Sequence, residues 1–234
     1  MQEIADDGLT LQVHRRLRAD LLGGRIAPGA KLKVQAIGAT YGAGASPVRE
    51  ALSSLAAEGL VQRIEGRGFR AAPATVAEFD EIVRARCWLE EVVLRESLTA
   101  GDAAWEEALV VAQWRLGRLP RSGAEDPAWD AAHAAFHRAL LASCPSATLR
   151  DMAETLRERA GRYRSLARAV AYPGRDVAAE HAAIAEAALD RDADRAATLL
   201  AQHLGTTGEF VRLALERRAA GPARRRRPAA LAAE

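Results

Sequence analysis

At 234 residues the chain is long enough for two modest domains. Its hydrophobic share of 49% and charged share of 27% are those of a soluble globular protein, and no apolar run approaches the roughly 18 residues that a membrane helix needs. The first residues lack the basic and apolar segments of a secretory signal, and only Cys87 and Cys144 offer a disulfide. These features argue against a membrane protein and predict a cytoplasmic one.

The formal net charge of +2 is unevenly distributed along the chain. Residues 10–75 carry ten Lys or Arg against four Asp or Glu, whereas residues 76–215 carry seventeen against twenty-two. A basic first part and an acidic second part predict a polyanionic partner for the first part only. We expect one domain at residues 1–75, a second at 76–218, and a disordered basic tail at 219–234.

The sequence pattern at the start of the first domain predicts two helices. Apolar residues recur at every fourth position between 11 and 22, which is typical of an amphipathic helix: Val13, Leu17 and Leu21. A short helix over about 34–41 follows, and the glycines after it break the chain.

The third predicted helix starts with Ser46 as N-cap and Pro47 at the first helical position, and Gly59 stops it. After it, two short apolar runs flank the glycine turn of residues 65–68, which predicts a β-hairpin. Two short helices and a hairpin in this order are typical of a winged helix-turn-helix. Such a module places its third helix in the major groove of duplex DNA.

The expected DNA contacts lie on the third helix, on the segment before the second helix and on the hairpin. The base readers are the first residues of the third helix: Ser46, Val48 and Arg49. Phosphate or minor-groove contacts are expected from Lys31, Lys33, Gly66 and Arg67. Arg49 suits a bidentate contact with guanine. Its alternative is a pair with a glutamate or with solvent on the helix surface.

The segments GAKL, SPVREALSSLAAEGLV and GRGF resemble the GntR family of winged-helix regulators over nearly the whole first domain. The resemblance implies that this domain binds operator DNA. The sequence departs from the family at Gly44 and Ala45, where the family often has Ser and Arg. Because the arginine is a frequent DNA contact, its absence implies an operator that differs from those of close relatives.

From residue 79 onward the pattern predicts helices only. We expect six, over about 79–100, 103–116, 127–143, 147–170, 177–189 and 193–217. Their starts carry N-cap residues: Asp102, Asp126, Ser146, Asp176 and Asp192. The predicted fold class is therefore mainly α, with a winged helix-turn-helix and a small hairpin wing followed by an all-α antiparallel helical bundle.

Four of the five histidines fall on interior faces of this bundle: His133, His137, His181 and His203. The first two are four residues apart and share one helix face. The last two helices should fold back on each other around Asp192, and His181 and His203 each lie eleven residues from that turn, so their levels match. Buried imidazoles without a shared cation leave nitrogens unsatisfied, so the set predicts a metal site. A single core histidine is more often a packing residue.

Two more polar side chains fall on apolar stripes. Arg86 needs an anion there, either Glu90 one turn away or the carboxylate of a bound ligand. Tyr163 falls on the apolar stripe of its own helix, and its hydroxyl either reaches the same cavity or belongs to the core. The other members of that stripe, expected to face inward, are Leu149, Met152, Leu156 and Leu166.

The pattern HAAFHRALLASC, the pair Glu180-His181, and His203 resemble the effector domain of the FadR-like branch of the GntR family, often called FCD. Members of that branch commonly bind a divalent metal through an Asp and three His, with a small carboxylate beside it. The resemblance therefore implies zinc or nickel, with manganese or iron as alternatives, and a small organic acid as effector. His133 stands at the usual Asp or Asn position, as in the subgroup around the carbon-starvation-induced regulator.

Together these features predict a metabolite-responsive transcriptional regulator, a repressor rather than an enzyme, that binds a pseudo-palindromic operator as a homodimer. The alternative is a metal-dependent hydrolase with Glu180 as general base. Four protein ligands argue against that alternative, because catalytic zinc usually keeps one position open. A hydrolase also has no need of the first domain.

Overall fold

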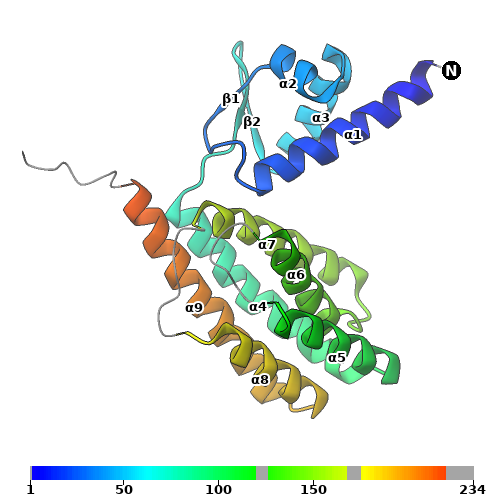
Figure 1. Ribbon diagram of the computed structural model, residues 1–234, viewed down its shortest axis with the longest axis vertical. Coiled ribbons are helices and arrows are strands. Elements are labelled where there is room, and N and C mark those ends of the chain that lie inside the picture. The colour runs from blue at the N-terminus through cyan, green and yellow to red at the C-terminus, as the bar shows by residue number, and fades with distance from the viewer. Residues whose placement is uncertain (1, 120–125, 168–174, 220–234) are drawn as a thin grey trace, which may run out of the picture.

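The computed structural model describes residues 2–119, 126–167 and 175–219 (Figure 1). The N-terminal elements are α1 (Gln2–Leu22), β1 (Lys31–Leu32), α2 (Val34–Tyr41), α3 (Ala45–Ala57), β2 (Val61–Ile64) and β3 (Gly68–Ala71). The bundle consists of α4 (Val76–Ala100), α5 (Ala103–Gly117), α6 (Pro127–Leu141), α7 (Ala147–Leu166), α8 (Val177–Leu189) and α9 (Ala193–Ala219). The predicted fold class is confirmed. The predicted tail lies outside the described residues beyond Ala219.

The three strands form one antiparallel sheet in the order β1-β3-β2. The hairpin of β2 and β3 is the predicted wing, and its turn needs glycine at Gly66 and Gly68, whose φ angles are 66° and 88°. β1 pairs with Phe69 and Arg70 of β3. The sequence does not predict β1, because a strand of two residues is too short to show an alternating pattern.

The N-terminal domain has its own hydrophobic core. The apolar residues predicted for α1 are fully buried in one cluster with the inner face of α3: Val13, Leu17, Leu21, Val48, Leu52 and Leu55. α3 begins at Ala45 after Gly44, so the prediction of Ser46 as N-cap is wrong. The Ser46 hydroxyl lies instead 3.4 Å from Glu50 Oε1, one turn further along the helix.

Every predicted N-cap of the bundle is present. The side-chain oxygen accepts a hydrogen bond from the backbone N–H three residues later at Asp102, Asp126, Ser146, Asp176 and Asp192. Thr75 caps α4 in the same way. Because these bonds satisfy N–H groups that have no partner within the helix, they fix where each helix begins. The start of a helix in turn sets the level of the side chains that it carries.

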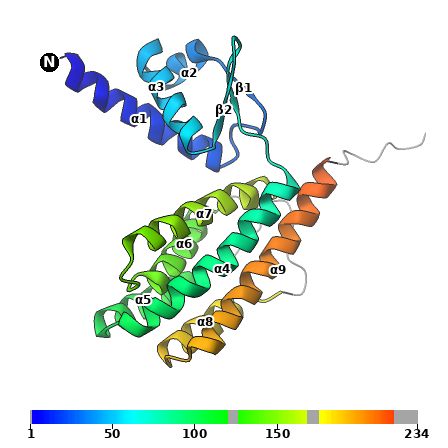
Figure 2. The ribbon, with the colours of Figure 1, turned by 180° about the vertical axis from the view of Figure 1, so that it is seen from behind.

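The helices of the bundle enclose a second core. α4 packs against α6, α7 and α9, whereas α5 packs against α6 and α8, and α8 packs against α9. The N-terminal domain contacts the bundle through α1 and α7. Figure 2 shows α4 and α9 side by side on the face of the bundle opposite to that of Figure 1. Within the described ranges, no helix has the length and apolarity for a bilayer crossing.

Candidate metal centre and DNA-binding surface

Four imidazoles meet inside the bundle, as the sequence predicts. They come from three helices: His133 and His137 from α6, His181 from α8, and His203 from α9. None of the four residues is more than 5% exposed, and one nitrogen of each lies within 4.8 Å of the corresponding nitrogens of the others. Nitrogens that bind a tetrahedral zinc ion at about 2.1 Å lie about 3.4 Å from one another, so a contraction of up to about 1.4 Å brings this set to bonding distance.

The helix starts and one tight turn set the levels of these rings. The Asp176 cap starts α8, and the chain reverses after α8 through Arg191, whose φ of 60° lies in the left-handed region. As a result His181 and His203 lie at one level on antiparallel helices, with ring centroids 4.5 Å apart. The geometry predicted from their equal spacing about the turn is confirmed.

The contacts of the rings fit a metal. Nε2 of His133 and Nε2 of His137 lie 3.2 Å apart, and Trp129 stacks on His133 with ring centroids 4.6 Å apart. Within the described chain, three buried ring nitrogens have no hydrogen-bond partner: Nδ1 of His133, Nδ1 of His137 and Nε2 of His181. Because an unpaired buried nitrogen is costly, a metal ion that accepts lone pairs from these rings would lower that cost.

Protonation favours coordination as well. Burial lowers the pKa of all four imidazoles, and that of His181 falls to about 3. The rings are therefore neutral at physiological pH, and neutral imidazole is the form that binds metals.

A carboxylate and a guanidinium orient the fourth ring from outside. Nδ1 of His203 lies 2.8 Å from Oε2 of Glu180, and Arg175 donates from Nε to the other oxygen of Glu180 at 2.6 Å. Burial alone raises the pKa of Glu180, but the hydrogen bonds with His203 and Arg175 outweigh it and lower this pKa to about 2. A carboxylate bound to one ring nitrogen leaves the other nitrogen free for a metal, which is a common arrangement around metal-binding histidines.

A cavity of about 290 Å³ opens beside His137, between α4, α6 and α7. Its lining includes three arginines, which are Arg138, Arg150 and Arg157. Arg157 is 8% exposed, and its Nε donates to Glu154 Oε2 at 2.7 Å. The sequence reasoning missed these arginines. The seven-residue interval between Arg150 and Arg157 is the signal that places both on one face of α7.

The two predicted effector-binding residues lie in different places. Arg86 is buried and donates to Glu90 Oε1 at 2.7 Å, which is the alternative weighed for it, and Glu90 lines the cavity beside His137. Tyr163 packs against Phe79, with ring centroids 4.9 Å apart, in another hydrophobic cluster. The structure therefore brings Arg86 near the histidines, but it does not place Tyr163 along the cavity lining.

The inward face of α7 also differs from the prediction. Met152, expected on the interior stripe that leads to Tyr163, is 52% exposed. Ala153, Arg157 and Ala160 are buried instead.

Most of the residues predicted to contact DNA are exposed: Lys31, Lys33, Ser46, Arg49, Gly66 and Arg67. The prediction for Val48 is wrong, since this residue is 0% exposed and packs in the core of the N-terminal domain on the inner face of α3. Within the described chain Arg49 has no ion pair, and it lines a shallow hollow with Arg63 of the wing.

The sequence reasoning missed two exposed wing arginines, Arg63 and Arg70. Arg70 lies directly opposite Lys31 in the register of β1 and β3, so the two cations share one face of the sheet. The signal that could have identified Arg70 is the alternation of exposed and buried residues along β3. Its position opposite Lys31 follows only once β1 is recognised as a strand. The exposed cations of α3 and the sheet thus form a basic surface suited to the phosphates and base edges of DNA.

Comparison with known proteins gives two family matches. Residues 9–70 match the gntR family of bacterial regulatory proteins, and residues 81–206 match the FCD domain. The chain is 36% identical to an uncharacterized HTH-type transcriptional regulator, BphR, of Paraburkholderia xenovorans, over 85% of this chain and 83% of the relative. It is 33% identical to the HTH-type transcriptional repressor GlaR of Escherichia coli, over 88% of this chain and 97% of that protein.

Solved structures share the fold. The chain superposes on E. coli McbR/YncC with a TM-score of 0.74 at 22% identity, covering 87% of this chain and 96% of that one. A GntR transcriptional regulator from Rhodococcus sp. RHA1 gives a TM-score of 0.69, again at 22% identity, covering 86% of this chain and 96% of that one.

These families and relatives are transcriptional regulators rather than enzymes, so the hydrolase alternative is set aside. The DNA-binding module and the helical domain account for both matches in their order along the chain. The chain belongs to the GntR family of bacterial regulatory proteins, as a DNA-binding transcriptional regulator with an FCD effector-binding domain.

Proposed function

We propose that this regulator is a cytoplasmic repressor whose helical domain binds a divalent metal and a small carboxylate, and that it binds a pseudo-palindromic operator as a homodimer. The observation that carries the proposal is the meeting of four buried imidazoles beside a cavity that three arginines line. One relative, GlaR of Escherichia coli, is a transcriptional repressor, which supports repression as the sign of regulation.

The donor set favours metals that bind nitrogen well. A set of four imidazoles suits zinc or nickel better than the oxygen-preferring cations, with iron or manganese as alternatives. When bound, the ion would supply a positive charge that attracts an anionic ligand to the neighbouring cavity. The chain itself holds the four rings neutral and orients His203 through Glu180.

Arg157 is the residue that we assign to the ligand carboxylate. Its guanidinium is buried at the cavity wall and already binds the carboxylate of Glu154, which is the geometry that a ligand carboxylate needs. A ligand bound there competes with Glu154. Because Glu154 also receives a bond from Arg138 at 3.2 Å, it keeps a partner when Arg157 is taken.

Replacement of Arg157 by glutamine is expected to weaken carboxylate binding about 10- to 100-fold, because one charge-assisted bidentate contact is lost. The measurement is the rise in unfolding temperature of the metal-loaded protein with a panel of short-chain mono- and dicarboxylates. The control is Arg159→Gln on the same helix, since Arg159 binds Glu78 instead. Equal responses of the two variants would contradict the assignment.

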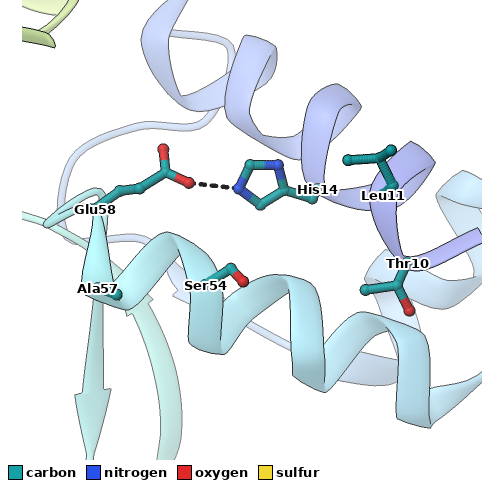
Figure 3. A pocket seen from close by; sticks show the side chains of 6 residues that line it. All are labelled: Thr10, Leu11, His14, Ser54, Ala57 and Glu58. Atoms are coloured by element: carbon teal, nitrogen blue, oxygen red, sulfur yellow. Dashed lines mark hydrogen bonds and ion pairs between the residues drawn. The ribbon is translucent and has the colours of Figure 1, made fainter. Parts of the chain in front are cut away.

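Helix α7 links the cavity to the DNA-binding domain. Glu158 follows Arg157 directly, and Arg18 of α1 donates to Glu158 Oε2 at 2.5 Å. Arg18 also donates to Glu58 at the end of α3, at 2.7 Å, and His14 contacts the other oxygen of Glu58 at 2.5 Å (Figure 3). A ligand that shifts α7 at Arg157 therefore acts on the position of α3 through Arg18.

Replacement of Arg18 by alanine is expected to loosen the contact between the two domains. Because the ion pair with Glu158 is partly exposed, the effect is modest, about a two- to fivefold faster amide exchange at residues 72–76 between the domains. Hydrogen exchange with mass spectrometry measures it. Arg16→Ala is the matched control, since Arg16 lies over the ring of Tyr41 within the DNA-binding domain. The idea fails if both variants exchange alike.

A further inference from the structure

One face of α4 is exposed along the helix although large apolar side chains lie at its centre. The stripe consists of Glu81, Arg84, Trp88, Val92, Glu96 and Thr99. Trp88 is 66% exposed and Val92 is 49% exposed. In Figure 2, no described element lies in front of the middle of α4. A tryptophan and a valine one turn apart thus form an apolar pair without cover in the single chain.

The charged side chains on either side of this apolar pair have opposite signs. Arg84 lies one turn before the pair and Glu96 one turn after it. Neither has a partner within the part of the chain that the structure describes. The neighbouring Arg95, in contrast, is satisfied within the chain by Asp194 at 2.8 Å. The unpaired charges therefore belong to the same stripe as the exposed apolar pair.

The stripe is symmetric about position 90 of the helix. Arg84 and Glu96 lie six residues to either side of that position, and Trp88 and Val92 lie two. A two-fold axis through position 90 places Arg84 opposite Glu96 of a second copy, about 9 Å from the axis, and Trp88 opposite Val92 of that copy. A second α4, antiparallel to the first, thus covers the apolar pair and neutralises both charges.

We propose that α4 is the self-complementary centre of the homodimer. This inference rests on the proposed function, which requires a dimer, and it assigns the dimer contact to a surface. α5 also exposes large apolar side chains, but its Trp114, which is 58% exposed, is partly occupied by Arg118 of the same chain at 5.2 Å from the ring. The stripe on α4 therefore carries the stronger case for a second copy.

The test is the dimer dissociation constant of the full chain, from sedimentation equilibrium. Arg84→Glu and Glu96→Arg should each weaken the dimer about 10-fold, because each change affects two equivalent pairs. The combined variant exchanges the charges and should return to within about threefold of the original protein. Trp88→Ala should weaken the dimer about 30-fold or more, and Trp114→Ala should leave it unchanged.

Circular dichroism checks that each variant folds, which is expected because all of these side chains are exposed. Single charge changes without effect, or a combined variant that stays dissociated, would overturn the assignment. So would dissociation by Trp114→Ala alone. Operator binding by mobility shift is measured separately. If the substitutions leave the dissociation constant unchanged and the protein still binds the operator, only the assignment of the dimer contact to α4 is refuted. If the dimer is intact but binds no operator, the proposed function is refuted.

Discussion

Replacement of His137 by alanine is expected to lower the metal content of the purified protein from about one ion per chain to under about a tenth. His137 is 1% exposed and its ring contacts those of the other three histidines, so no surface side chain can take its place. Loss of a ligand costs more than loss of an outer hydrogen-bond partner, which typically costs 10- to 100-fold in affinity. Elemental analysis of dialysed protein measures the content.

The fifth histidine provides the matched control. His14 binds Glu58 in the DNA-binding domain, so His14→Ala should retain the metal. A metal that binds the folded state alone also raises the unfolding temperature, so a chelator should destabilise the original protein and His14→Ala but leave His137→Ala unaffected. The metal centre would be refuted if the His137→Ala protein keeps its metal. It would also be refuted if the original protein contains no metal after purification and takes up none when metal is added.

Much of this centre follows from local signals. The caps at Asp126 and Asp176 fix the starts of α6 and α8, and the equal distances of His181 and His203 from one turn fix their shared level. Such features depend on residues close in sequence, so spacing reveals them. The same reasoning finds the winged domain, because its glycines and apolar repeats are local as well.

The errors concern side chains whose surroundings come from distant parts of the chain. α7 is rich in alanine and arginine, so its periodicity does not identify the inward face, and contacts with α4 and α6 decide that Arg157 is buried and Met152 exposed. Val48 lies near the start of α3, which predicts a DNA contact, but its spacing with Leu52 and Leu55 places it on the inner face of the helix, where it is buried. Arg70 becomes a candidate only through a two-residue strand.

Replacement of Arg49 by alanine is expected to weaken operator binding about 10- to 100-fold per half-site, because a bidentate contact with a base is lost. Arg49 is suited to this contact since it is exposed near the start of α3 and no carboxylate in the described chain holds it. Competition mobility shifts, with DNA from upstream of the gene as probe and with single-base operator variants, measure the change.

Specificity separates Arg49 from the wing. If Arg49 reads a base, its loss should relax the preference at one position of each half-site, while Arg67→Ala should weaken all sequences alike and reduce the salt dependence. Arg115→Ala, an exposed arginine of α5 in the other domain, should change neither property. A uniform loss for Arg49→Ala would make that residue a phosphate contact. Unchanged binding would remove α3 as the reading helix, because no other exposed arginine lies on that helix.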